Sequence, residues 1–129
     1  MRALFLSLFL LLGFGSLQSA EAQVNRPVKV KINQQKIVTG RLAIKVVSVE
    51  DSRCPTGTRC VWAGNAKVTI RVTNARGAAQ TFDLNTNLQP KSIRFAGYEI
   101  RLTDVNPRPA NNIRINRNGY TATFSVTRL

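Results

Sequence analysis

Residues 66–84 read AKVTIRVTNARGAAQTFDL, and this stretch decides the fold class. Apolar and polar residues alternate from 66 to 72, which is typical of a strand with one buried face. The turn sequence NARG follows. A three-residue loop with Gly77 in the left-handed conformation pairs Ile70 with Phe82, whereas a two-residue loop pairs Ile70 with Thr81. Because only the first pairing sets apolar against apolar, we predict a bulged β-hairpin.

The same alternation recurs in three other runs, and helical periodicity is not found. Their apolar members are Val28, Val30 and Ile32; Leu42, Ile44 and Val46; and Tyr120, Ala122, Phe124 and Val126. Each run has one apolar and one polar face, as in a half-buried antiparallel sheet.

Two more hairpins are predicted from turn residues. A turn at Ala96-Gly97 pairs Ile93 with Ile100, Phe95 with Tyr98 and Arg94 with Glu99. A turn at Asn118-Gly119, the stronger signal, pairs Ile115 with Ala122 and Ile113 with Phe124. Seven or eight short strands with regular turns favour an all-β chain forming a single antiparallel β-sandwich, with an immunoglobulin-like arrangement as one option. The alternative is a small β-barrel.

The N-terminal segment has the pattern of an export signal. Arg2 precedes an apolar run at residues 4–12, and Ala20-Glu21-Ala22 fits the cleavage pattern of small residues. We predict a signal peptide over residues 1–22 and one disulfide-stapled domain over 23–129, periplasmic or extracellular; an uncleaved anchor helix is the alternative. The net charge of +13 stays with the domain, because Arg2 and Glu21 cancel.

Residues 51–64, DSRCPTGTRCVWAG, contain the only two cysteines and the only tryptophan of the chain. The spacing of Cys54 and Cys60 is too wide for a CxxC redox pair, and without histidine a zinc site lacks ligands. In an oxidising compartment a disulfide is expected, with Pro55 and Gly57 supporting a tight ring. Closing a ring of this size stabilises the fold by about 2 kcal/mol.

The cysteine segment has a structural and a functional interpretation. As a staple, Trp62 packs over the disulfide or the core edge, and Asp51 accepts hydrogen bonds from the loop or pairs with an arginine. As a presented loop, the contacts come from Arg53, Thr58, Arg59 and Trp62. A basic residue in a pre-ordered ring also fits an inhibitor of trypsin-like proteases.

Two motifs support a resemblance. DSRCP, four residues and then C-x-W-x-G, together with Y-x-I-x-L-x-x-V-x-P-x-P over residues 98–109, resembles the pattern of a set of small exported bacterial proteins of unknown function. The resemblance covers residues 44 to 126 approximately. It implies an exported bacterial β-domain, and it carries no activity and no functional residue.

The residue inventory does not favour catalysis. Without histidine the commonest general base is missing, and no serine or cysteine has a partner for a triad. Neither a catalytic residue nor a metal or cofactor site is expected; the alternative is a carboxylate-dependent enzyme that uses a pair among its few acids. The acids after the signal are Glu50, Asp51, Asp83, Glu99 and Asp104.

The charge is the better functional indicator. Bases outnumber acids by 19 to 6, far from the mixed signs of an ordinary surface. Those on the polar side of the predicted strands are Lys29, Lys31, Lys45, Lys67, Arg71, Arg94, Arg101 and Arg114. We predict a non-enzymatic binding module for an anionic envelope or extracellular polymer. Sequence-specific nucleic-acid binding is not expected, because aromatic residues are few. The sequence does not indicate an oligomeric state.

Overall fold

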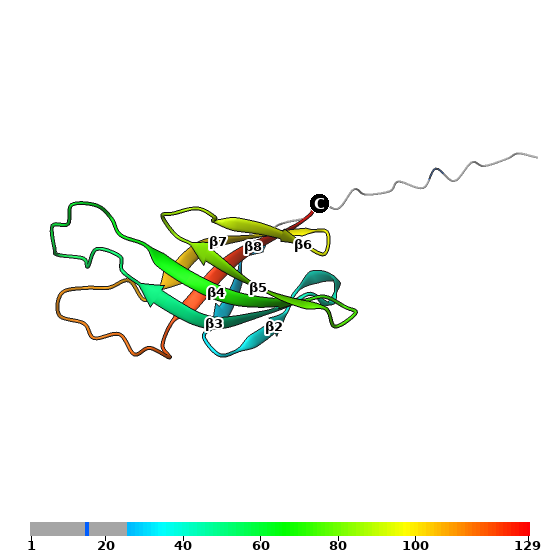
Figure 1. Cartoon of the computed structure of the whole chain (residues 1–129), viewed down its shortest axis with the longest axis horizontal. Helices are drawn as coiled ribbons and strands as arrows, with labels where there is room; N and C mark the ends of the chain where they lie inside the picture. Colours follow the sequence, from blue (N-terminus) through cyan, green and yellow to red (C-terminus); the bar gives the residue numbers. More distant parts are fainter. Residues whose placement is uncertain (1–14, 16–25) are drawn as a thin grey trace, which may run out of the picture.

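The computed structural model describes residue 15 and residues 26–129. The predicted signal peptide, residues 1–22, lies outside the described residues except for Gly15. Eight strands and one short 3-10 turn follow one another along the chain (Figure 1). The strands are β1 (Val28–Lys31), β2 (Gln35–Ile37), β3 (Ala43–Asp51), β4 (Ala66–Thr73), β5 (Ala79–Asn85), β6 (Ser92–Phe95), β7 (Tyr98–Asn106) and β8 (Thr121–Arg128), and the 3-10 turn is η1 (Thr39–Arg41).

The strands form two antiparallel sheets of four strands each, which confirms the predicted β-sandwich. One sheet has the order β2-β3-β4-β5 and the other β1-β8-β7-β6. The chain changes sheet only after β1 and after β5, so each sheet is mainly a meander, unlike the Greek-key order of immunoglobulin domains. The sheets do not close into the alternative barrel; an isolated bridge between Ile32 and Val46 joins them at one corner.

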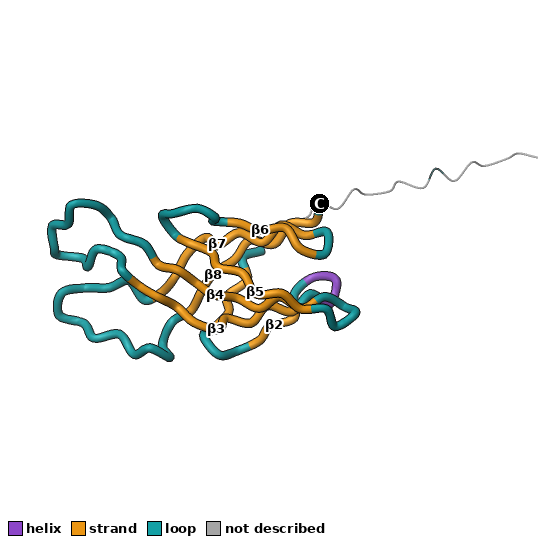
Figure 2. Tube along the Cα trace, in the orientation of Figure 1, coloured by secondary structure: helices purple, strands orange, loops and turns teal. Residues whose placement is uncertain are grey.

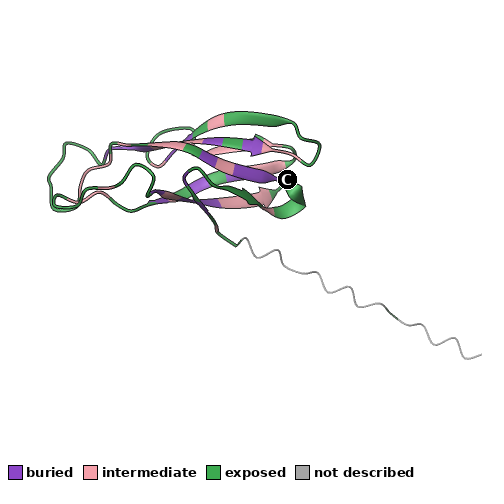
Figure 3. Ribbon diagram, turned by 90° about the horizontal axis from the view of Figure 1, so that it is seen from below, coloured by how far each residue is buried: buried purple, intermediate pink, exposed green. Residues whose placement is uncertain are grey.

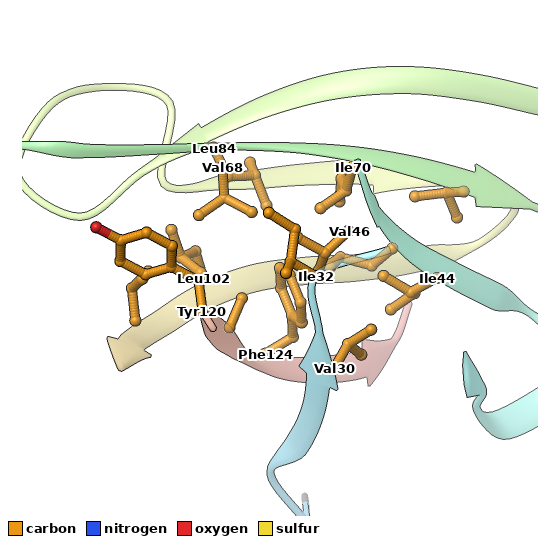
Figure 4. Close-up of a cluster of buried hydrophobic side chains, with 14 of the residues drawn as sticks. Val30, Ile32, Ile44, Val46, Val68, Ile70, Leu84, Leu102, Tyr120 and Phe124 are labelled. Carbon is orange, nitrogen blue, oxygen red and sulfur yellow. The ribbon is translucent and has the colours of Figure 1, made fainter. Parts of the chain in front are cut away.

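The core lies between the sheets and consists of the apolar residues of the alternating runs (Figure 4). Ile44, Val68 and Ile70 come from one sheet, and Ile100 and Phe124 from the other; all five side chains are completely buried. Their polar neighbours along each strand point outward, because successive side chains of a strand alternate between its faces. The predicted inward faces are therefore confirmed.

Two of the three predicted hairpins are confirmed. The β4–β5 register pairs Ile70 with Phe82, and Gly77 has a φ of 84°, as the bulged loop requires. The β6–β7 register pairs Ile93 with Ile100. It also sets Arg94 against Glu99 and Phe95 against Tyr98. Both turns are short, so the turn residues alone fix the register.

The third predicted hairpin is wrong. A turn does form, with the Gly119 amide donating to the Asn116 carbonyl at 2.9 Å, but no strand precedes it. The partners of β8 are instead β7 and β1, which places Val30 opposite Ala122. Val30 is almost completely buried there, whereas Ile113 is exposed. Each edge of a strand accepts one partner, and the two edges of β8 are occupied by β7 and β1. Pairing with β1, which buries the β1 valines, therefore replaces the predicted hairpin.

The long connections all lie at one end of the sandwich, on the left in Figures 1 and 2. They are residues 52–65, 86–91 and 107–120, which we call the loop end. The opposite end has only short connections at residues 38–42, 74–78 and 96–97. A rigid sheet scaffold with long loops at one end is an arrangement in which binding residues commonly lie.

Candidate functional site: the loop end

The cysteine loop is a stiff extension of the β3–β4 hairpin. Its ladder continues beyond the strands, because the Ser52 amide donates to the Asn65 carbonyl and the Cys54 amide to the Ala63 carbonyl, both at 2.8 Å. A Cys54–Cys60 disulfide closes the predicted ring, with a Cα separation of 6.0 Å. Inside the ring, the chain reverses at Gly57, which has a φ of 90°. The ring therefore presents a largely fixed backbone.

The 107–120 loop lies beside the ring (Figure 1). The Thr56 amide donates to the Pro109 carbonyl at 2.8 Å, and the Asn111 amide donates to the Thr56 carbonyl at 3.3 Å. The Thr58 hydroxyl also donates to the Asn111 side chain. Thr58 thus contributes to joining the two loops, in addition to its predicted place in a contact loop.

The 86–91 loop is joined to the base of the cysteine loop by asparagines. Asn65 and Asn85 are buried, and the Asn65 amide group donates to the Asn85 side-chain oxygen at 2.9 Å. Asn87 donates from its backbone to Asn65 at 3.0 Å and from its side chain to the Gly64 carbonyl at 2.6 Å. This network is not predictable from the sequence, since single asparagines in loops give no pattern. The three loops consequently form one connected unit.

A buried ion pair fastens the cysteine loop to the opposite sheet. Arg53 binds Asp51 through two nitrogens, at 2.8 and 2.9 Å, and the side chains are only 11% and 5% exposed. Arg53 also donates to the carbonyls of Val105 at 2.7 Å and Pro107 at 2.9 Å. The Tyr120 hydroxyl donates to Asp51 at 3.0 Å. The prediction that Asp51 pairs with an arginine is confirmed, but Arg53 is not presented for binding.

The same contacts shift three pKa values. Burial alone raises the pKa of Asp51, but the hydrogen bonds and charge of Arg53, with the Tyr120 hydroxyl, bring it below its ordinary value. The hydrogen bond to Asp51 raises the pKa of Arg53 despite burial. Burial, followed by the hydrogen bond to the Asp51 carboxylate, raises the pKa of Tyr120. All three groups are held in the charge states that bind one another.

Trp62 does not pack over the edge of the core, so that part of the expectation is wrong. Its side chain is 54% exposed and is not among the core residues. The hairpin extension carries residues 60–63 beyond the sheets, where all of them are exposed (Figure 3). The hydroxyl of Tyr120, which Figure 4 shows at the edge of the core, forms the contact with the loop base instead.

The loop end carries no carboxylate in any of its three loops. Its cations are Arg53, Arg59, Lys91, Arg108, Arg114 and Arg117. Arg53 is neutralised by Asp51, and Arg108 lies 3.9 Å from Asp104. Arg59, Arg114 and Arg117 are exposed, and none of the ion pairs in the described part of the chain involves them. Three arginines are therefore free to meet an anion.

The predicted basic positions do not form one surface. Lys29, Lys31, Arg94 and Arg101 lie on strands of the β1-β8-β7-β6 sheet, whereas Lys45, Lys67 and Arg71 lie on the other sheet. Because each sheet turns its apolar face to the core, these residues point to opposite sides of the molecule. Some are also paired, such as Lys67 with Glu50 at 3.2 Å and Arg101 with Glu99 at 3.7 Å. Only Arg114 belongs to the loop end.

An open cavity of about 580 Å³ lies between the end of β3 and residues 115–120, and it contains two carboxylates. The Asp51 oxygens are already bound by Arg53 and Tyr120, and the Glu50 oxygen pairs with Lys67. Both carboxylates therefore already have a cationic partner. Among residue 15 and residues 26–129, no group of three or more His, Cys, Asp or Glu side chains could hold a metal ion.

Comparisons with protein-family models, with curated proteins and with solved structures found no match for this chain. No helix in the described part of the chain is long and apolar enough to cross a membrane. The fold and the site define a small disulfide-stapled β-sandwich with a basic loop end.

Proposed function

We propose that this protein is an exported, non-enzymatic binding module that holds an anionic ligand of the cell envelope or its surroundings at the loop end. The single observation that carries the proposal is the set of three exposed arginines, Arg59, Arg114 and Arg117, on loops without a carboxylate. A disulfide that closes a surface ring is compatible with export, as is the predicted signal peptide.

The arginines suit phosphate, sulfate and carboxylate groups. A guanidinium presents a planar fork of donors that matches such anions, and its charge persists at any physiological pH. The loops that carry the three arginines are held by the disulfide, by Thr56 and by Arg53. Since these contacts exist before binding, little backbone order has to be created when an anion arrives.

Matched charge variants test the proposal with heparin as the anionic probe. We expect Arg59→Gln, Arg114→Gln and Arg117→Gln together to lower the affinity for heparin at 50 mM salt at least tenfold. Each arginine should account for about one third of the loss in binding free energy. The control is Lys29→Gln, Arg94→Gln and Arg101→Gln, which removes the same charge from a sheet face. We expect the control to lose less than threefold.

The proposal is contradicted if both triple variants weaken binding equally, or if wild-type affinity does not fall as salt rises. The inhibitor alternative depends on Arg59 alone, because only Arg59 is an exposed base within the disulfide ring. Inhibition of a trypsin-like protease that survives Arg114→Gln and Arg117→Gln but not Arg59→Ala would favour that alternative.

A further inference from the structure

Each of the three loops at the loop end exposes a large apolar side chain. Val61 and Trp62 lie in the cysteine loop, Leu88 in the 86–91 loop and Ile113 in the 107–120 loop. Val61 is completely exposed, and the other three are about half exposed. Scattered apolar residues are normal on protein surfaces, but four on the connected loops of one end are a group.

In two of the loops the apolar residues lie close to a free arginine along the chain. Arg59 precedes Val61 by two positions, and Ile113 is followed directly by Arg114. These two loops extend well beyond the sheets in Figure 1, whereas the 86–91 loop with Leu88 stays nearer to them.

The loops themselves carry apolar tips and cations but no carboxylate. The two acids that share a cavity with Arg117 are bound, Glu50 by Lys67 and Asp51 by Arg53. Apolar tips beside cations are complementary to a surface that is apolar inside and negative outside.

We infer that the ligand of the loop end is an anionic phospholipid surface, into whose interfacial layer Val61, Trp62 and Ile113 insert while Arg59, Arg114 and Arg117 bind lipid phosphates. This inference rests on the proposed function and names its ligand. Tryptophan favours this layer because its ring is apolar and its N–H is polar. A charged polysaccharide would use the arginines alone and leave the three apolar side chains in water.

The fastening of the loops fits this use. The Cys54–Cys60 ring and the contacts of Thr56 and Arg53 hold the backbone of two loops, so the tips reach the layer without unfolding. The backbone hydrogen bonds that continue the β3–β4 ladder also satisfy N–H and C=O groups of the cysteine loop. Without these bonds, such groups would be left without a hydrogen-bond partner near lipid, where water is excluded. Insertion is limited to side chains at the tips of the loops.

Trp62 supplies the test, because it is the only tryptophan of the chain. Protein exported by an expressing bacterium is mixed with vesicles of phosphatidylglycerol and phosphatidylcholine, or of phosphatidylcholine alone. We expect a blue shift of Trp62 emission and co-sedimentation with the anionic vesicles only. Any N-terminal residues that remain after export do not contribute to this fluorescence.

Variants separate the inference from the proposed function. We expect Val61→Ser combined with Ile113→Ser to lower vesicle affinity at least about tenfold and leave heparin affinity unchanged. Ile37→Ser, which replaces an exposed residue near the opposite end, is the matched control and leaves both unchanged.

Three results would overturn parts of the account in distinguishable ways. Heparin binding without a Trp62 shift on anionic vesicles, or vesicle binding unaffected by the double serine variant, refutes insertion into a lipid surface and leaves the anion-binding function standing. A shift on phosphatidylcholine as large as on anionic vesicles also refutes it. If the wild-type protein binds neither heparin nor anionic vesicles, both proposals are refuted.

Discussion

At the scale of single residues, the Asp51–Arg53 pair determines how the loop end is built. The pair is nearly inaccessible to water, and Arg53 additionally satisfies two carbonyls at the end of the opposite sheet. A charge in such a place is strongly destabilising when it loses its partner. From the sequence, Asp51 was expected to accept hydrogen bonds from the loop or to pair with an arginine, and both occur, because the Arg53 amide also donates to Asp51 at 3.1 Å. The carbonyls of Val105 and Pro107 were beyond prediction, since they depend on how the sheets pack.

Asp51→Asn should lower the free energy of unfolding by about 3–5 kcal/mol at pH 7, because Arg53 loses its counter-charge. The Asp51 pKa lies below its ordinary value in the folded state, so the stabilisation is present above the unfolded pKa and is lost as pH falls through the folded one. The difference between wild type and variant should therefore shrink below about pH 4. Denaturant titrations at several pH values measure it.

Glu50→Gln is the matched control for that substitution. Glu50 is the neighbouring acid and pairs with Lys67 at the surface, where an ion pair contributes at most about 1 kcal/mol. A loss in Asp51→Asn no larger than in Glu50→Gln, or a loss that does not change with pH, would contradict the buried ion pair.

At the scale of elements, local chemistry fixes some strand pairings and leaves others open. The β4–β5 and β6–β7 hairpins were predictable because Gly77 and Ala96-Gly97 connect strands directly. The pairing of β8 with β1 was not predictable, because β1 lies some ninety residues earlier in the chain. Which segment pairs with β8 depends on whether the β1 valines or Ile113 and Ile115 become more deeply buried there. The hydrogen bonds that join the 107–120 loop to the ring were likewise not predictable, because no residue pattern in either loop indicates them.

Gly64 should be the most sensitive glycine of the cysteine loop. It has a φ of 74°, and a Cβ there would lie 2.7 Å from the Arg53 Cα and closer still to the Ser52 carbonyl oxygen. We expect Gly64→Ala to cost at least about 3 kcal/mol, from the left-handed backbone and the overlap together. Thermal unfolding measures this loss.

Gly77→Ala separates the two causes. Gly77 has a φ of 84° but no neighbouring atom within 4 Å of a Cβ, so only the backbone contribution of about 1–2 kcal/mol applies. Equal losses for the two variants would show that the cysteine loop is not packed as closely as described.

At the scale of the whole molecule, the number of charges matters less than where the fold puts them. Strand parity predicted correctly that Lys29, Lys45 and Arg94 leave the core, but not that they point to opposite sides. Three exposed arginines without an ion pair come together at the loop end, because the fold brings the sequence-distant loops 52–65 and 107–120 side by side there. Of these arginines, Arg59 and Arg114 were predictable from the sequence, whereas Arg117 was not, because it lies in no alternating run.

The most direct measurement is an NMR titration of the isotope-labelled protein with a heparin oligosaccharide. If the loop end binds anions, amide signals of residues 52–65 and 107–120 shift together and saturate with one affinity, while those around Lys29, Arg94 and Arg101 or around Lys45 and Arg71 stay in place. Shifts confined to either sheet face, with the loop signals unmoved, would contradict the account.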